Sequence, residues 1–300
     1  MSFRYQKNPT IETKKNILNK IFMLVLTGFC YCPSSGISDN LQDTFVEAGV
    51  NAFNERLYSK ALKEWGKALN QGSSLALEGD FRALNNIGVM YERGLGVRQD
   101  FKEAEKRYKI AASNGSTEAK HNLGLLYHLG NGVNQDDTKA FNWFRKAAIE
   151  KLPESEYMLG LLYYLDLGLP MSLKDSERFS EAKSWFLMAA RKGYPEAQFM
   201  VGYLFNSGQL KSVNNESAFI WTYIAKENGF EMASALNYEN EIALCDGLIT
   251  VADIQNSRLF FGLGDQKEKD IGTSDCDKKI IRAKEKALMC TQSQYKSCPE

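Results

Sequence analysis

The 300-residue sequence has little proline, which is enriched in disordered chains, and little histidine, the commonest acid–base catalyst. It holds only 6 prolines and 2 histidines, and its 37 basic residues balance its 37 acidic ones. With so few prolines and 44% hydrophobic residues, a folded chain is expected. The balanced charge, without a concentrated basic face in the sequence pattern, gives no electrostatic footprint for nucleic acid. We therefore expect a folded protein that has no nucleic-acid partner.

The sequence near the N-terminus has no hydrophobic run of the length that usually spans a bilayer. The apolar segment Ile21–Leu26 follows four lysines, and small residues occupy positions 34–36. A basic stretch before a short apolar stretch is typical of an export signal. We predict that residues 1–36 are a signal peptide, that the mature chain starts near Ile37, and that it keeps no stable membrane span. The alternatives are an uncleaved anchor and a buried hydrophobic helix.

Cysteines are few, and their placement agrees with export. Cys30 and Cys32 lie in the predicted signal, and the other four lie in the last fifth of the chain: Cys245, Cys276, Cys290 and Cys298. An even number in an exported segment indicates two disulfides, with three pairings open. On one continuous helix Cys290 and Cys298 are about 12 Å apart, so a bond between them needs the helix to end or double back. A zinc site is the alternative, but ligand-pair spacing and a nearby histidine are lacking.

What the sequence does contain is one helical unit in about five copies. Ala83, Gly88, Tyr91, Gly94 and Gly96 recur 36 residues later, at the following positions: Ala119, Gly124, Tyr127, Gly130 and Gly132. The next copy keeps Gly160, Tyr163 and Gly168, and an insertion of six residues then lengthens the step to 42. A fixed period of this length predicts stacked helical repeats.

Each copy is predicted to form two antiparallel helices, which in the second full copy cover about 118–129 and 138–150. Apolar residues follow three-and-four spacing in both segments. A glycine in the middle of the first helix costs about 1 kcal/mol relative to alanine, and we interpret it as making room for the small alanines of the second helix. Gly130 and Gly132 allow positive φ in the turn, and Asp100 and Asp136 or Asp137 are placed to cap the second helices.

This pattern resembles the Sel-1-like repeat family, whose units are longer relatives of tetratricopeptide repeats. The resemblance rests on Leu-Gly-x-x-Tyr from Leu123, the Gly-x-Gly-Val turn, the capping Asp, and Ala-x-x-Trp-x-x-x-Ala-Ala in the second helix. It implies an all-α fold, an α/α solenoid of antiparallel helix pairs with about five repeats. Asp166 and residues 207–211 depart from the turn pattern, so those turns are expected to differ in conformation.

The predicted organisation begins with the signal and a tetratricopeptide-like leading repeat and ends with a helical cap. The segments are 1–36 for the signal, 39–72 for the leading repeat, 80–115, 116–151, 152–193 (with the insertion) and 194–229 for the full repeats, and 230–300 for the cap with four cysteines. A cap is expected because a terminal repeat exposes an apolar face that something must cover.

Residues that carry chemistry are sparse. His121 and His128 lie seven apart with no third ligand, so we predict no metal site. The Ser-x-x-Lys tetrads at Ser180 and Ser293 are short enough to occur by chance, and Ser180 is placed where it would cap a helix. No cofactor motif is present, because helices flank each glycine pair. Glycosylation sequons at 114–116 and 215–217 matter only in a eukaryotic secretory pathway.

The resemblance implies a non-enzymatic scaffold that binds a protein or peptide in its concave groove, and the predicted signal makes it exported, periplasmic or secreted in a bacterium. We predict the groove from free positions on the first helices: Asn86, Val89, Asn122, Leu125, Met158, Leu161, Met200 and Tyr203. For Val89, Leu125, Leu161 and Tyr203, ordinary packing between adjacent repeats is the competing interpretation. A cysteine-rich Sel-1-like hydrolase or penicillin-binding protein is the alternative function, and an adaptor of the endoplasmic reticulum lumen is a third.

Overall fold

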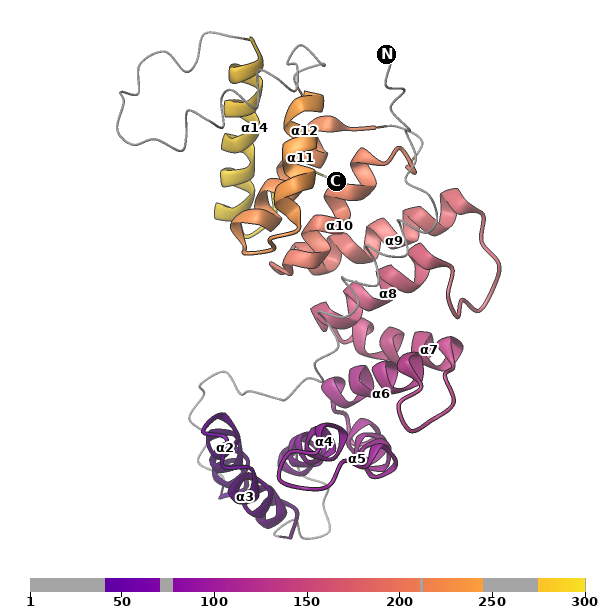
Figure 1. Cartoon of the computed structure of the whole chain (residues 1–300), viewed down its shortest axis with the longest axis vertical. Coiled ribbons are helices and arrows are strands. Elements are labelled where there is room, and N and C mark those ends of the chain that lie inside the picture. The colour runs from indigo at the N-terminus through magenta and orange to yellow at the C-terminus, as the bar shows by residue number, and fades with distance from the viewer. Residues whose placement is uncertain (1–40, 71–77, 211–212, 245–274, 300) are drawn as a thin grey trace, which may run out of the picture. The chain divides into compact units, whose positions relative to one another are not determined.

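The computed structural model describes residues 41–70, 78–210, 213–244 and 275–299. These residues form twelve α-helices and no strand, which confirms the all-α expectation for this part of the chain. They fall into two units that divide between Ala147 and Ala148. Within each unit, helices that follow one another in the sequence pack as pairs (Figure 1).

The first unit contains three helix pairs. Its helices are α2 (Leu41–Asn54), α3 (Tyr58–Asn70), α4 (Glu78–Arg93), α5 (Phe101–Ser113), α6 (Thr117–Leu129) and α7 (Asp137–Ile149), of which α7 ends just beyond the boundary. Asp100 caps α5 by accepting hydrogen bonds from the N–H groups of Lys102 and Glu103. Asp136 likewise accepts from the N–H of Lys139 at 2.9 Å. Both predicted caps are therefore confirmed.

The second unit contains two further pairs and a helical end. Its helices are α8 (Pro153–Leu165), α9 (Asp175–Ala190), α10 (Pro195–Asn206), α11 (Asn215–Glu227), α12 (Ala233–Leu244) and α14 (Asp275–Gln292). The helix α14 packs on α11 and α12, and Ile220, Trp221 and Ile224 of α11 are buried. This arrangement covers the apolar side of the last repeat.

The mid-helix glycines of the first three full repeats lie against large rings, so the expectation that small alanines face them is wrong there, whereas Gly202 of the fourth lies against Thr222 and the backbone of Ala218. A Cβ atom added to Gly124 would lie 2.6 Å from a ring carbon of Phe144. The same contact recurs between Gly88 and Tyr108, at 2.6 Å. Because a real Cβ does not approach a carbon this closely, the glycine lets an aromatic side chain of the second helix rest directly on the backbone of the first.

In the turn that follows each first helix, the residue at the first glycine position has a positive φ. The expectation that Asp166 adopts a different conformation at this position is therefore wrong. Gly94 and Gly130 have φ of 67° and 71°, and Asp166 has φ of 61°. Asp tolerates the left-handed region better than most non-glycine residues. Gly208 in the fourth copy also has a positive φ, of 69°.

The chain doubles back after α14, as a contact between its cysteines requires. Cys290 and Cys298 lie close together, with their Cα atoms 4.7 Å apart, because α14 ends at Gln292 and the chain then turns back. The indole N–H of Trp221 donates to the carbonyl of Pro299 at 2.9 Å, which fixes this segment to α11. Cys245 lies outside the described residues, and the side chain of Cys276 is not among those described.

Candidate functional site

Seven of the eight residues predicted to line a groove are buried in the structure. They lie in the middle of α4, α6, α8 and α10: Asn86, Val89, Asn122, Leu125, Met158, Leu161 and Met200. Asn122, for example, donates to the side-chain oxygen of Asn85 at 3.0 Å inside the core. Tyr203 is partly exposed, and its ring meets that of Tyr164 edge-on at 6.3 Å. Tyr203 is therefore the member that a partner can reach without moving a helix.

The first helices of the full repeats, α4, α6, α8 and α10, are enclosed along their middles. In α6 every residue from His121 to Tyr127 is buried, and in α8 every residue from Ser155 to Leu162 is buried. Seven consecutive residues make almost two helical turns and thus point in all directions. The accessible side chains lie instead on the turns and on the outer faces of the second helices, α3, α5, α7 and α9.

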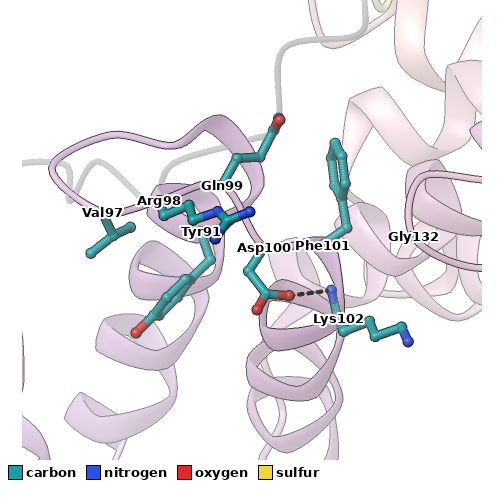
Figure 2. Close-up of a pocket in the computed structure, with 8 residues that line it drawn as sticks. All are labelled: Tyr91, Val97, Arg98, Gln99, Asp100, Phe101, Lys102 and Gly132. Carbon is teal, nitrogen blue, oxygen red and sulfur yellow. Dashed lines mark hydrogen bonds between the residues drawn. The ribbon is translucent and has the colours of Figure 1, made fainter.

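One cavity lies at such a turn in the first unit, and we call it the turn-edge pocket. It has a volume of about 630 Å³ and is lined by the residues labelled in Figure 2: Tyr91, Val97, Arg98, Gln99, Asp100, Phe101, Lys102 and Gly132. The turn that contains Gly132 rests on the start of α5, where a side chain on Gly132 would collide with Phe101. The Gln99 amide donates to the carbonyl of Glu92 at 2.8 Å. The end of α4 and the start of α5 therefore fix the positions of the residues that line the pocket.

The pocket carries two cations that form no ion pair within the described part of the chain. They are the side chains of Arg98 and Lys102, which lie on either side of Asp100 (Figure 2). Asp100 is engaged at 3.0 Å with the backbone N–H groups of Lys102 and Glu103. Tyr91, Val97 and Phe101 supply partly buried apolar surface. The arrangement suits a negatively charged group attached to an apolar body.

Sequence reasoning missed Arg98 and Lys102, although a signal for them exists. Arg98 stands in an exposed turn, and the next copy has Asn134 at the same position of the repeat. Residues that differ between copies at exposed positions are free of the packing that the repeat imposes. A comparison restricted to the turns would have marked this position.

The outer faces of the second helices in the first unit are basic, and the expectation that the repeats carry no basic face is wrong for this unit. The helices α3, α5 and α7 together hold ten basic and four acidic residues. On α5 the exposed residues Lys102, Lys106 and Lys109 follow four-and-three spacing, which places them in one row. The corresponding helix of the second unit, α9, holds two basic and three acidic residues. The basic excess on the second helices is therefore larger in the first unit than on α9.

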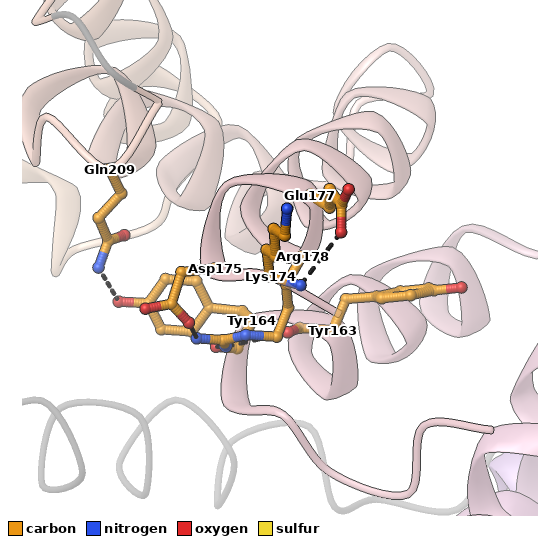
Figure 3. A network of polar contacts seen from close by, with 7 residues as sticks. All are labelled: Tyr163, Tyr164, Lys174, Asp175, Glu177, Arg178 and Gln209. Atoms are coloured by element: carbon orange, nitrogen blue, oxygen red, sulfur yellow. Dashed lines mark hydrogen bonds and ion pairs between the residues drawn. The ribbon is translucent and has the colours of Figure 1, made fainter. Parts of the chain in front are cut away.

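A polar network in the second unit holds the inserted loop of the third copy (Figure 3). Arg178 of α9 donates to the carbonyls of Tyr163 and Tyr164 at the end of α8, and also to Asp175 at 2.8 Å. The Gln209 amide donates to the Tyr164 hydroxyl at 3.3 Å. A guanidinium at the C-terminal carbonyls satisfies groups that a helix leaves unpaired. The network is accordingly structural, and it supports the ring beside Tyr203.

The other residues considered for chemistry are separated. His121 is buried against the Phe144 ring at 5.4 Å, whereas His128 Nδ1 lies 2.6 Å from Asp137 Oδ1. In the described residues no group of three or more His, Cys, Asp or Glu side chains is arranged for a metal ion. Ser180 lies inside α9, which begins at Asp175, so its predicted capping role is wrong.

Two further sequence features were considered above: the Ser-x-x-Lys tetrad at Ser293 and the N-terminal segment. The Ser293 hydroxyl donates to the carbonyl of Cys290 at 2.8 Å, within the returning C-terminal segment. The predicted signal peptide, residues 1–36, lies outside the described residues. Among the helices that the structure describes, none combines the length and the apolar character needed to cross a membrane.

Four consecutive stretches of the sequence match the Sel1 repeat family. They are residues 82–116, 117–150, 153–194 and 195–230, which correspond to the helix pairs α4–α5, α6–α7, α8–α9 and α10–α11. The family identification made from the repeat pattern is therefore confirmed. No curated protein matches the sequence.

Two solved structures share this fold. One is a Sel1 repeat protein from Oxalobacter formigenes, 22% identical with a TM-score of 0.58, over 80% of this chain and 99% of that chain. The other is c5321, a protective antigen present in uropathogenic Escherichia coli strains that displays an SLR fold. It is 24% identical with a TM-score of 0.59, over 85% of this chain and 48% of that chain, so this chain spans about half of its length. At these identities the likeness shows the fold alone.

Proposed function

Because this chain is a Sel1-repeat protein, we propose that it is a non-enzymatic scaffold that binds a protein or peptide partner. Proteins with these repeats are generally interaction scaffolds. Solenoids present extended surfaces because each repeat contacts only its neighbours. The proposal assigns the described repeats the role of a rigid frame, and it assigns recognition to the side chains that this frame leaves exposed.

One observation carries the proposal: the copies share an interior and differ on their surface. In each full repeat, the second helix has alanine at two positions, and these alanines are fully buried. They are Ala104, Ala140, Ala182 and Ala218 at the first position, and Ala111, Ala147, Ala189 and Ala225 at the second. Between them, one exposed position holds Lys106, Asn142 and Ser184 in three successive copies. A constant core with a changing surface gives each repeat its own contacts without altering the fold, which is what a recognition scaffold needs.

We place the contact surface on the exposed turns and second helices, together with Tyr203. Tyr203 offers a ring at low cost in side-chain entropy, as tyrosines at interfaces do. Burial raises the pKa of the Tyr203 hydroxyl, with a smaller contribution from Tyr164, so the group stays a neutral hydrogen-bond donor or acceptor. Met200 is buried, and a charge there would disrupt the core rather than test binding.

The test is capture of a partner by the full chain from cells that make it, followed by hydrogen exchange of the purified complex. We expect new protection at the turns and second helices, because the middles of the first helices are already enclosed. Tyr203→Ser is expected to weaken capture, whereas Tyr238→Ser, a change at a partly exposed tyrosine of α12 outside the proposed surface, serves as the matched control. Capture that is equal for both variants would remove Tyr203 from the surface.

The enzymatic alternative is tested with the same preparation. A chromogenic β-lactam added to the purified chain is expected to remain unhydrolysed, with no stoichiometric label on Ser180 or Ser293. Turnover of the reporter, or failure of the chain to retain any partner from its native compartment, would overturn the scaffold proposal.

We also propose export, on the pattern of residues 1–36 and on the cysteine geometry. The Cα separation of 4.7 Å between Cys290 and Cys298 lies within the range of about 4.4–6.8 Å that a disulfide allows. Such bonds persist in oxidising compartments. Fractionation of the producing cell and sequencing of the mature N-terminus test the proposal, with a start near Ile37 expected. A full-length chain retained with reduced cysteines in the cytosol would contradict it.

A further inference from the structure

The exposed row Lys102, Lys106 and Lys109 on α5 runs directly from the turn-edge pocket. The rise of an α-helix, about 1.5 Å per residue, separates Lys102 from Lys106 by about 6 Å and Lys106 from Lys109 by about 4.5 Å along the helix axis. Residues on one face of an extended peptide repeat every two residues, or about 6.8 Å. The first spacing is close to that of alternate side chains in an extended chain, and the second is shorter by about 2 Å, a difference that flexible lysine side chains can span.

These lysines are available to an incoming anion. Lys102 has no ion pair within the described part of the chain. Lys106 lies 3.9 Å from Glu103 with its side chain 65% exposed, and Lys109 lies 2.7 Å from Glu105 with its side chain 50% exposed. Exposed pairs of this kind contribute only about 0–1 kcal/mol. A ligand that offers several carboxylates can replace them.

The pocket adds what the row lacks, which is a recess with apolar walls beside a cation. Arg98 can bind a carboxylate through two parallel N–H groups. Tyr91, Val97 and Phe101 line the same cavity, whose volume of about 630 Å³ admits more than one side chain. We propose that the turn-edge pocket and the lysine row of α5 bind an extended acidic polypeptide segment that places one carboxylate against Arg98 and others along the row. The inference rests on the proposed scaffold function and specifies the chemistry of the partner.

Two features favour a polypeptide over other polyanions. The apolar side chains Tyr91, Val97 and Phe101 line the pocket beside Arg98, which suits the uncharged side chains between the carboxylates of a peptide. Glu103 and Glu105 stand among the cations of α5, and they would repel a continuous phosphate backbone, whereas a peptide with spaced carboxylates avoids them. The bound segment is therefore expected to alternate acidic with uncharged residues.

The experiment measures binding of the full chain to a fluorescein-labelled peptide of alternating glutamate and leucine residues, about twelve residues long, at physiological ionic strength. We expect affinity that falls as salt is added. Lys102→Glu/Lys106→Glu/Lys109→Glu is expected to lose about tenfold or more, because three attractive contacts become repulsive. Arg98→Asn, which installs the residue that the next copy has at this position, is expected to lose about threefold or more.

The matched control reverses three exposed basic residues of the second unit, as Lys278→Glu/Arg282→Glu/Lys296→Glu, for the same change in net charge. It is expected to keep wild-type affinity. Equal losses in both triple variants, or no binding by the wild type, would overturn the inference. So would tighter binding of vesicles containing phosphatidylglycerol, or of a single-stranded oligonucleotide, than of the peptide.

Arg98→Asn keeps the test valid if the triple variant unfolds, since circular dichroism of a variant with one exposed turn substitution is expected to match the wild type. The two levels of the proposal are separable. If the native partner is captured equally by the wild type, the Lys102/Lys106/Lys109 triple variant and Arg98→Asn, the scaffold function stands and the acidic-segment assignment fails. If the peptide binds but no partner is ever captured, the scaffold function fails.

Discussion

Replacing Gly124 by alanine tests the contact that recurs in the repeats. The built Cβ atom lies 2.6, 2.7 and 2.9 Å from three ring carbons of Phe144. Phe144 is fully buried and packs against His121, so its ring has little freedom to move away. Alanine in a helix interior gains about 1 kcal/mol over glycine, but overpacking costs about 1–3 kcal/mol. With three carbons inside contact distance we take the upper part of that range and expect a net loss of about 1–2 kcal/mol.

Gly66 provides the matched control, because it lies inside α3 and an added Cβ would have no atom within 4 Å apart from those of its own helix backbone and chain neighbours. Gly66→Ala is expected to stabilise the protein by about 0.5–1 kcal/mol through helix propensity alone. The assay is urea unfolding followed by circular dichroism, with slopes compared so that the change is read as a change in stability. The two alanine substitutions are thus expected to have opposite signs.

A second background isolates the ring. In Phe144→Leu, Gly124→Ala is expected to become nearly neutral, because the two outer ring carbons that collide are gone and the remaining Cδ1 belongs to a side chain that can rotate away. If Gly124→Ala stabilises the wild type as Gly66→Ala does, or if its effect is unchanged by Phe144→Leu, then the reasoning from close approach is wrong.

Three further predictions concern buried titratable groups and one strained residue. Burial lowers the pKa of His121 to about 3, so the free energy of unfolding is highest above about pH 6.5 and falls as the pH decreases toward 3. The loss between pH 7 and pH 5 is about 2 kcal/mol. In His121→Phe, the thermal unfolding temperature is expected to lose this pH dependence. Burial raises the pKa of Glu92, partly opposed by the Tyr108 hydroxyl at 2.6 Å, so the ionised form destabilises the fold as pH rises above 4.5. Glu92→Gln is therefore expected to unfold at higher urea than wild type at pH 7, with the difference vanishing near pH 4; a constant difference would contradict this. Lys151 has φ of 68° where other copies have glycine, so Lys151→Gly is expected to stabilise by about 1 kcal/mol, and destabilisation in urea unfolding would contradict the strain.

Helix positions were predictable because they depend on local pattern. The segments expected at 118–129 and 138–150 are α6, Thr117–Leu129, and α7, Asp137–Ile149. Capping residues and apolar spacing act over a few residues, so one copy contains the information and the next copy repeats it. The candidate site was less predictable. The expected groove positions proved mostly buried, since periodicity identifies a face of a helix but does not show what covers it.

The amino-acid sequence by itself determined the unit of this protein: a helix, a glycine turn, a capped second helix, and their repetition with one insertion. Each of these depends on residues close together in the chain. The tertiary structure alone decided that aromatic rings rest on the mid-helix glycines of three repeats, that the first helices are enclosed, and that Arg98 and Gly132 of the following turn line one pocket. Those facts depend on residues about one repeat apart, whose contact is set by how helices stack, and sequence pattern carries no distance between them.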